Sequence, residues 1–210
     1  SQACIPQSPR DLSVYNELPE FTFGTLYANF SLVNIHFHHN SEHKLKGMER
    51  ATNGNEGLEY PSNTKGLYEF RHCQSVNVDE TYEIHFVFSS CGGHSNDGLS
   101  QAFVTCENPL ITVRAVSIVI SPNGANHIFT PTRDTYFVYQ GSTTGEKYSN
   151  EKCSKNQVLW VVNSETKTIT PETFDKFCSK ISSGYNIQKD LKPHNSRQLV
   201  SNSLGHSQVY

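Results

Sequence analysis

The chain has 210 residues, a length that suits one domain built around a single core. Its 17 Lys and Arg residues against 20 Asp and Glu residues give a formal net charge of −3, so no broad positive field attracts nucleic acid or an anionic membrane. No apolar run approaches the roughly 20 residues of a membrane-spanning helix. We therefore expect one domain over residues 1–210, with no nucleic-acid partner and no membrane span.

Five runs of alternating or wholly apolar residues, rich in β-branched and aromatic side chains, predict strands. In chain order they are 25–38, 81–89, 110–120, 135–139 and 157–163. Clusters of Gly, Asn and Ser between them supply turn chemistry and predict surface loops at 53–57, 91–98 and 122–125. The pattern predicts a mainly β fold.

One peripheral helix is expected towards the C-terminal end of the chain. Thr170 can cap it and Pro171 suits its first position, and an apolar face repeats at helical spacing through Phe174, Phe177, Cys178 and Ile181. From about residue 182 to residue 210 the chain is polar and poorly periodic. We expect this segment to wrap the surface or to fray.

The chain contains six cysteines, an even count, and none of them lies in a CxxC pair. Such pairs are typical of structural zinc or thioredoxin chemistry, so their absence favours disulfides over free thiols. Disulfides imply an oxidising compartment. We therefore expect a secreted or periplasmic protein whose signal peptide has been removed.

Two histidines lie on one face of the first predicted strand. The period of two along a strand places His36 and His38 together and turns Phe37 to the other side. His85 lies in the strand predicted over 81–89. If the two strands are neighbours, three imidazoles converge, and three histidines with one open position form a zinc site that lowers the pKa of a bound water to about 7.

A second enzyme class fits part of the same stretch. His36, His38 and Glu42, followed by Gly47, approximate the first motif of the cupins, in which two histidines and a glutamate bind manganese or iron. A cupin also needs a second motif with a Pro-x-Gly turn and a fourth ligand histidine. The downstream candidate, His127, lacks that pattern, so the cupin is the weaker alternative.

Several segments resemble alpha-class carbonic anhydrases, and they follow one another in the same order. Residues 36–43 are similar to the HFHWG…SEH stretch of that class, and residues 83–87 to its ELHLVHW strand. The QSPxDI, YxGSxTTPP, VxWIV and NxRPxQ motifs have similar segments at 7–11, 139–144, 158–162 and 195–198. The particular form around residues 34–44 and after His85 most resembles the delta class.

This resemblance implies a central twisted mixed sheet with few peripheral helices. It implies reversible hydration of carbon dioxide to bicarbonate and a proton, by attack of a zinc-bound hydroxide. The implied zinc ligands are His36, His38 and His85. Because three imidazoles accept several divalent ions, Co²⁺ or Cd²⁺ can substitute for Zn²⁺.

The resemblance also implies roles beside the metal. Glu42 accepts a hydrogen bond from Thr143, whose oxygen then accepts from the hydroxide and orients it. The chain lacks the apolar residue normally found between GS and TT, so this role can fall to Thr144 instead. An apolar wall for carbon dioxide is implied at Val87, Val116, Val158 and Trp160.

Cysteine pairing and the proton shuttle are less defined. The resemblance implies a Cys4–Cys153 disulfide that braces the loop bearing the active threonine. A second expected bridge joins Cys91 and Cys106, which leaves Cys73 and Cys178 paired or free. No shuttle histidine can be carried over, because residues 11–33 contain none; composition alone offers His39, His43, His72, His94 and His127.

Two alternatives stay open from the sequence. A catalytically silent carbonic-anhydrase-like binding module arises when a ligand histidine is lost, although all three positions are histidine here. The sequence does not distinguish a monomer from a homodimer.

Overall fold

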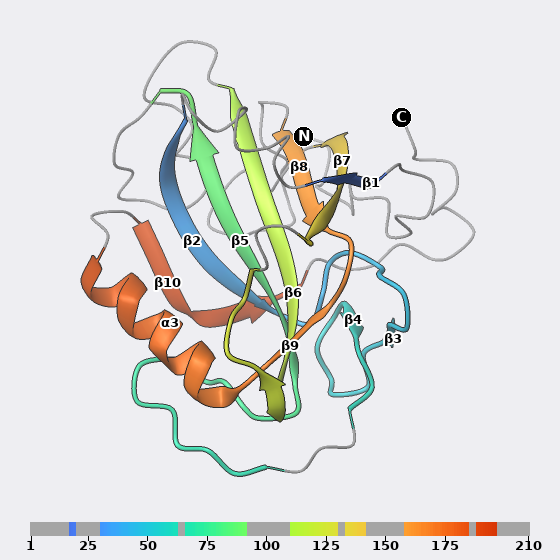
Figure 1. Ribbon diagram of the computed structural model, residues 1–210, viewed down its shortest axis with the longest axis vertical. Coiled ribbons are helices and arrows are strands. Elements are labelled where there is room, and N and C mark those ends of the chain that lie inside the picture. The colour runs from blue at the N-terminus through green and yellow to red at the C-terminus, as the bar shows by residue number, and fades with distance from the viewer. Residues whose placement is uncertain are drawn as a thin grey trace.

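Most of the described chain forms one mixed β-sheet with a helix packed against it (Figure 1). The structure is a computed structural model that describes residues 17–19, 30–62, 66–91, 110–129, 133–141, 158–184 and 188–196. Its elements are β1 (Glu17–Pro19), β2 (Ser31–His39), β3 (Glu49–Arg50), β4 (Leu58–Glu59), β5 (Thr81–Ser89), β6 (Ile111–Ala125), β7 (Thr135–Gly141), β8 (Val158–Asn163), β9 (Lys167–Ile169), α3 (Pro171–Gly184) and β10 (Gln188–Asn195).

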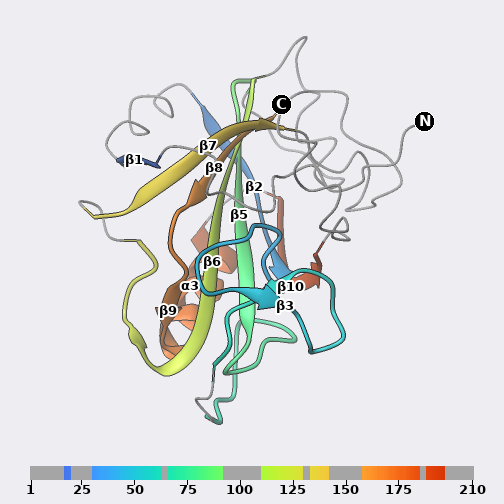
Figure 2. The ribbon, with the colours of Figure 1, turned by 90° about the vertical axis from the view of Figure 1, so that its right-hand side faces the viewer.

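The strands of the main sheet lie in the order β1-β7-β8-β6-β5-β2-β10, and β9 also pairs with β6. The pairs β2–β10, β6–β8 and β6–β9 are parallel, whereas β1–β7, β2–β5, β5–β6 and β7–β8 are antiparallel. The strands fan out between β7 and β2, as expected of an open twisted sheet (Figure 2). Over the described residues, the expected mainly β fold with a central mixed sheet and a peripheral helix is confirmed.

The predicted strands agree with the observed ones except near their ends. β5 has the expected bounds, but β6 continues through 122–125, a stretch whose composition predicts a surface loop. The loop prediction is wrong because β6 bends, so that Ile120 and Ala125 both pair with Ile169 of β9 (Figure 2). Pro122 and Asn123 are exposed, as a surface segment requires. A Cβ atom on Gly124 would lie 2.3 Å from the carbonyl carbon of Ile169, so glycine here permits a close backbone approach.

Part of the segment after residue 182, the strand β10 at Gln188–Asn195, is more regular than its composition predicts, whereas 197–210 lie outside the described residues. β10 pairs in parallel with β2, with His194 opposite His38 and Asn195 opposite His39. The strand is held by pairing with a neighbour rather than by an apolar alternation of its own, so a search for periodicity misses it. The assignment of 1–210 to one domain stays a prediction.

Helix α3 begins as predicted. The backbone N–H of Thr173 donates to Oγ1 of Thr170 at 3.2 Å, and Pro171 is the first helical residue. Its inward side is buried at Phe174, Cys178 and Ile181. α3 has 14 residues, and no helix in the described ranges is long and apolar enough to cross a membrane.

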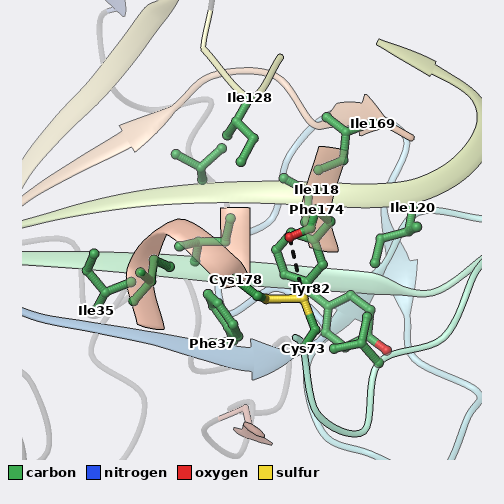
Figure 3. Packing of buried hydrophobic residues seen from close by; sticks show 14 of the residues in the cluster. Ile35, Phe37, Cys73, Tyr82, Ile118, Ile120, Ile128, Ile169, Phe174 and Cys178 are labelled. Atoms are coloured by element: carbon green, nitrogen blue, oxygen red, sulfur yellow. Dashed lines mark hydrogen bonds between the residues drawn. A yellow bond between two sulfur atoms is a disulfide. The ribbon is translucent and has the colours of Figure 1, made fainter. Parts of the chain in front are cut away.

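α3 closes an apolar core on one face of the sheet, which we call the helix face (Figure 3). The ring centroids of Phe37 on β2 and Phe174 on α3 lie 5.2 Å apart. A disulfide between Cys73 and Cys178 fastens the helix to the segment that precedes β5, and Tyr82 lies beside it (Figure 3). The two cysteines that the sequence leaves unassigned are therefore bonded to each other.

The opposite face, which we call the histidine face, carries a second apolar cluster. β5, β6 and β8 contribute to it through Val87, Val113, Ala115, Trp160 and Val162. The segment between β2 and β5 adds Leu45, Met48 and Leu58. This face surrounds the histidines with buried apolar side chains.

Candidate metal centre

Three histidines meet on this face, on the adjacent strands β2 and β5. The register places His36 directly opposite His85, and His38 follows two residues later on the same face. The ring centroids lie 4.6 to 5.0 Å apart. One ring nitrogen of each lies within 4.8 Å of the others, and all three side chains are buried. The predicted convergence of the three imidazoles is thus present in the structure.

The two histidines of β2 are each held by a hydrogen bond on Nδ1. Nδ1 of His36 lies 2.6 Å from Oδ1 of Asn34, and Nδ1 of His38 lies 3.2 Å from the backbone carbonyl oxygen of Asn195. Both oxygens can only accept, so each Nδ1 carries the proton and donates it. The Nε2 lone pairs of both rings are left for a metal ion.

His85 is held in the opposite sense. Its Nε2 donates to Oε1 of Glu83 at 2.7 Å, so its Nδ1 presents a lone pair, and this atom lies 3.1 Å from Nε2 of His36. Two facing lone pairs at this distance repel unless a cation lies near both. Burial, followed by the neighbouring charges of His85 and His38, holds the pKa of His36 well below its ordinary value, which favours the neutral form of the His36 ring.

These imidazoles fit a divalent metal ion. Burial lowers the pKa of His38 to about 4, against a smaller opposing effect of Glu42, so this ring is neutral near neutral pH. Neutral imidazole is the form that binds metals, and three such ligands with an open fourth position suit tetrahedral zinc. Among the described residues, His36, His38 and His85 are the group that could hold such an ion.

Glu83 is a buried carboxylate at the centre of a hydrogen-bond network behind the histidines. Besides accepting from His85, its Oε1 accepts from Nδ1 of His43 at 2.7 Å, and its Oε2 accepts from the backbone N–H of Glu42 at 2.6 Å. The Ser41 hydroxyl lies 2.8 Å from Oε2. Burial alone would raise the pKa of Glu83, but His43 and His85 outweigh it and hold that pKa well below its ordinary value. Glu83 is therefore an ionised acceptor.

His43 connects this network to β7 and β8. Because its Nδ1 donates to Glu83, its Nε2 accepts from the hydroxyl of Tyr139 at 2.5 Å. The Trp160 ring centroid lies 5.2 Å from that of His43 and 5.1 Å from that of His85. His43 is fully buried with both nitrogens engaged, an arrangement that does not favour a proton relay to solvent.

The implied carbon dioxide wall is divided by the sheet. Val87, Val158 and Trp160 belong to the apolar cluster of the histidine face. Val116 belongs to the helix-face cluster, because it follows Ala115, the residue opposite His85, and successive strand residues point to opposite faces. The structure therefore does not bring Val116 together with the histidines.

Glu42 lies behind the converging imidazole nitrogens rather than among them. It is buried, and its Oε1 lies 3.6 Å from Nδ1 of His38, the outer nitrogen of that ring. The group that could hold a metal ion contains His85 in place of Glu42, and His127 is exposed. The structure therefore does not support the cupin alternative.

Other predicted residues are placed as follows. Of the remaining shuttle candidates, His39 is half-buried on β2 and His72 is exposed, whereas His94 lies outside the described residues. Thr143 and Thr144 also lie outside them, so their roles stay predictions. Cys91 is disulfide-bonded. Its expected partner Cys106, and the expected pair Cys4 and Cys153, lie outside the described residues.

Sequence reasoning assigned no role to three residues that orient the imidazoles. Asn34 and Glu83 each precede a ligand histidine by two positions, so the strand period already places them on the ligand face. That signal was available in the sequence. Asn195 acts through its backbone carbonyl, which no side-chain pattern reveals.

Comparison with known proteins identifies the family of the chain. The model of the delta carbonic anhydrase family matches residues 27–173. No curated protein matches the chain. Among solved structures, an alpha carbonic anhydrase from the fungus Aspergillus oryzae is similar with 16% sequence identity and a TM-score of 0.24, over 55% of this chain and 50% of that one. Since the family match spans more than half of its residues, the chain belongs to the delta carbonic anhydrase family.

Proposed function

We propose that the protein catalyses the reversible hydration of carbon dioxide to bicarbonate and a proton, at a zinc ion held by His36, His38 and His85. Family membership supports the reaction. The observation that carries the proposal is the convergence of three imidazole nitrogens whose opposite ring nitrogens are each engaged by an acceptor. Zinc bound there supplies the Lewis acidity that lowers the pKa of a coordinated water to about 7.

The residues of the chain hold the ligands in the required tautomer and orientation. Asn34, Glu83 and the carbonyl of Asn195 each accept the proton-bearing nitrogen of one ring, which fixes the lone pair that faces inward. Without these acceptors each ring would rotate or exchange tautomers. Metal affinity is then expected to fall about 10–100-fold for each lost partner.

The surroundings suit a small apolar substrate. Val87, Val158 and Trp160 supply a water-excluding wall, since each has 1% exposure or less. We propose that the buried carboxylate of Glu42 positions the hydroxyl of Thr143, or of Thr144, beside the reacting oxygen. Co²⁺ and Cd²⁺ are expected to bind in place of zinc.

We further propose that the protein works outside the cytoplasm, where disulfides persist. The Cys73–Cys178 bond supports this location. Carbon dioxide and bicarbonate are the proposed small-molecule partners. A Cys4–Cys153 bridge and a Cys91–Cys106 bridge remain part of the proposal.

The function is tested by His85→Ala, with His127→Ala as the matched control. His85 is one of the three ligands, whereas His127 is an exposed histidine outside the metal-binding group. Zinc per chain is measured by plasma mass spectrometry, and hydration of carbon dioxide by stopped-flow with a pH indicator. We expect one zinc per wild-type chain, at least a thousand-fold loss of hydration in His85→Ala, and wild-type values in His127→Ala.

Two other results of these measurements would indicate a different function or a different ligand set. Stoichiometric zinc without hydration in the wild-type chain would indicate a silent binding module. Normal hydration in His85→Ala would refute the proposed ligand set.

A further inference from the structure

Only the oxygen of the Asn34 side-chain amide takes part in the hydrogen bonds described above. Asn34 is fully buried on β2, and its Oδ1 accepts from Nδ1 of His36. Its Nδ2, which carries two N–H donors, has no hydrogen-bond partner in the described structure. A buried donor without a partner destabilises the folded chain, so such a group in a native protein needs a reason.

The position of Asn34 gives that reason. It precedes His36 by two residues and lies opposite Val87 on β5, so all three share the histidine face. Val87 offers no acceptor to the amide. The acceptor that completes Asn34 must therefore come from outside the described residues, on the face where the proposed reaction takes place.

The nearby carboxylates repel an anion, so an anionic acceptor would be held on this face by the positive charge of the proposed zinc ion. Glu83, which orients His85, and Glu42, whose Oε1 lies 3.6 Å from Nδ1 of His38, are both carboxylates, and neither can donate a hydrogen bond when ionised. Bicarbonate brings three oxygens into this surrounding and needs donors. A hydrogen bond from a neutral amide to an anion is shorter and about twice as strong as one between neutral groups.

We propose that Nδ2 of Asn34 donates a hydrogen bond to an oxygen of bicarbonate bound at the metal centre. One amide then has two tasks: its oxygen fixes the tautomer of His36, and its nitrogen recognises the product. Asn34 is on this basis a substrate-contacting residue that sets affinity for bicarbonate rather than for carbon dioxide, whose oxygens are weak acceptors. The inference rests on the proposed function.

Two substitutions separate the two tasks. Asn34→Asp keeps an oxygen that accepts from His36 but removes the donor. Asn34→Leu, of similar volume, removes both and adds no charge. Asn163→Leu is the matched control: Asn163 is buried on β8 and its Nδ2 donates to Oδ2 of Asp134, but it follows Val162 and therefore points away from the histidine face.

The measurements are zinc affinity by competition with a chelator, bicarbonate affinity of the zinc-loaded protein by titration calorimetry, and KM for each substrate. For Asn34→Asp we expect undiminished zinc affinity and a dissociation constant for bicarbonate that is at least about ten-fold larger. The KM for carbon dioxide should change little. For Asn34→Leu we expect zinc affinity about 10–100-fold lower. At saturating zinc, Asn34→Leu should bind bicarbonate as weakly as Asn34→Asp does. Because leucine carries no charge, this result would exclude repulsion by the new aspartate as the cause.

The inference is overturned if both Asn34 variants, loaded with zinc, bind bicarbonate as the wild type does; the amide would then serve His36 and a buried water only. It is also overturned if Asn163→Leu weakens bicarbonate binding equally, since the effect would then be one of general stability. Failure of the proposed function is distinct, because it appears as absent hydration in the wild-type chain. In that case the calorimetric comparison still decides whether the amide contacts bicarbonate.

Discussion

The side chains on the two faces of β2 have different roles. Phe37 points to the helix face, where it packs against Phe174 inside a core closed by α3 and a disulfide. Its neighbours His36 and His38 point to the histidine face, where each ring is fixed by a hydrogen bond. A shift of one residue in register would exchange the two sets.

The contrast separates the interactions that stabilise the fold from those that orient the histidines. Apolar packing on the helix face is non-directional, so side chains of similar size can replace one another at modest cost. On the histidine face the direction of each hydrogen bond decides which nitrogen offers a lone pair. We expect changes on the first face to affect mainly unfolding, and changes on the second to affect mainly metal binding.

The largest expected effect comes from removing the disulfide of the helix face. Cys73→Ala combined with Cys178→Ala opens a link between residues 105 positions apart. The chain-entropy model assigns about 4.7 kcal/mol to a loop of about 100 residues. We expect the free energy of unfolding, measured with guanidinium chloride, to fall by about 4 kcal/mol.

Zinc affinity of the folded double variant is the measurement that makes this prediction specific to one face. It should stay within a few-fold of the wild-type value, because no orienting partner of the histidines is touched. An equally large loss of zinc affinity under conditions where the variant is folded would show that the two faces are not separable.

Glu83→Gln is expected to change a free energy by less than the loss of the disulfide does, but the free energy that it changes is that of zinc binding. The amide keeps the size of Glu83 but loses its charge, and its nitrogen can donate towards Nε2 of His85 and favour the wrong tautomer. We expect zinc affinity to fall about 10–100-fold, or about 1.4–2.7 kcal/mol. Competition with a chelator measures it, and fluorescence of Trp160, the single tryptophan of the chain, checks the fold.

Glu80→Gln is the control for this substitution. Glu80 is a carboxylate that accepts from the hydroxyl of Tyr82 and makes no contact with the three ligand histidines among the described hydrogen bonds. It should leave zinc affinity unchanged. If both glutamine variants lose the same affinity, loss of negative charge rather than tautomer control explains the result.

The sequence predicts the helix face and the ligand strand well for one reason: both rest on local periodicity. Phe37 alternates with the histidines at a period of two, and Phe174 and Cys178 repeat at helical spacing, so each residue can be assigned to a face without a partner. The pairing of Cys73 with Cys178 could not be predicted, because it depends on where α3 packs.

The parts of the site that escaped prediction depend on contacts distant in the sequence. The carbonyl of Asn195 reaches His38 only because β10 pairs with β2, and β10 has no apolar pattern of its own. The role of His43 depends on Tyr139, which β7 brings from 96 residues away. Val116, which the resemblance implies in the carbon dioxide wall, lies instead in the helix-face cluster.

The smallest effect concerns Asp175, a buried residue of α3 that holds the segment bearing Cys73. Burial alone would raise its pKa, but hydrogen bonds from the backbone N–H groups of His72, Arg71 and Cys73 outweigh it and hold the pKa of Asp175 below its ordinary value. A carboxyl with a lowered folded-state pKa contributes stability above the unfolded-state pKa of about 3.9, and this is lost as the pH falls through the folded-state value. This dependence predicts the effect of removing the ionised carboxylate.

Asp175→Asn keeps one acceptor oxygen, so we expect the substitution to lower the free energy of unfolding by about 1 kcal/mol at pH 7. The difference from the wild type should shrink as the pH falls below about 4. Urea unfolding of both proteins, each with a chelator so that release of metal from the histidine face does not contribute, measures this difference at pH 7, 5 and 3. A difference that stays constant across this range would mean that the ionised carboxylate of Asp175 does not stabilise the helix face.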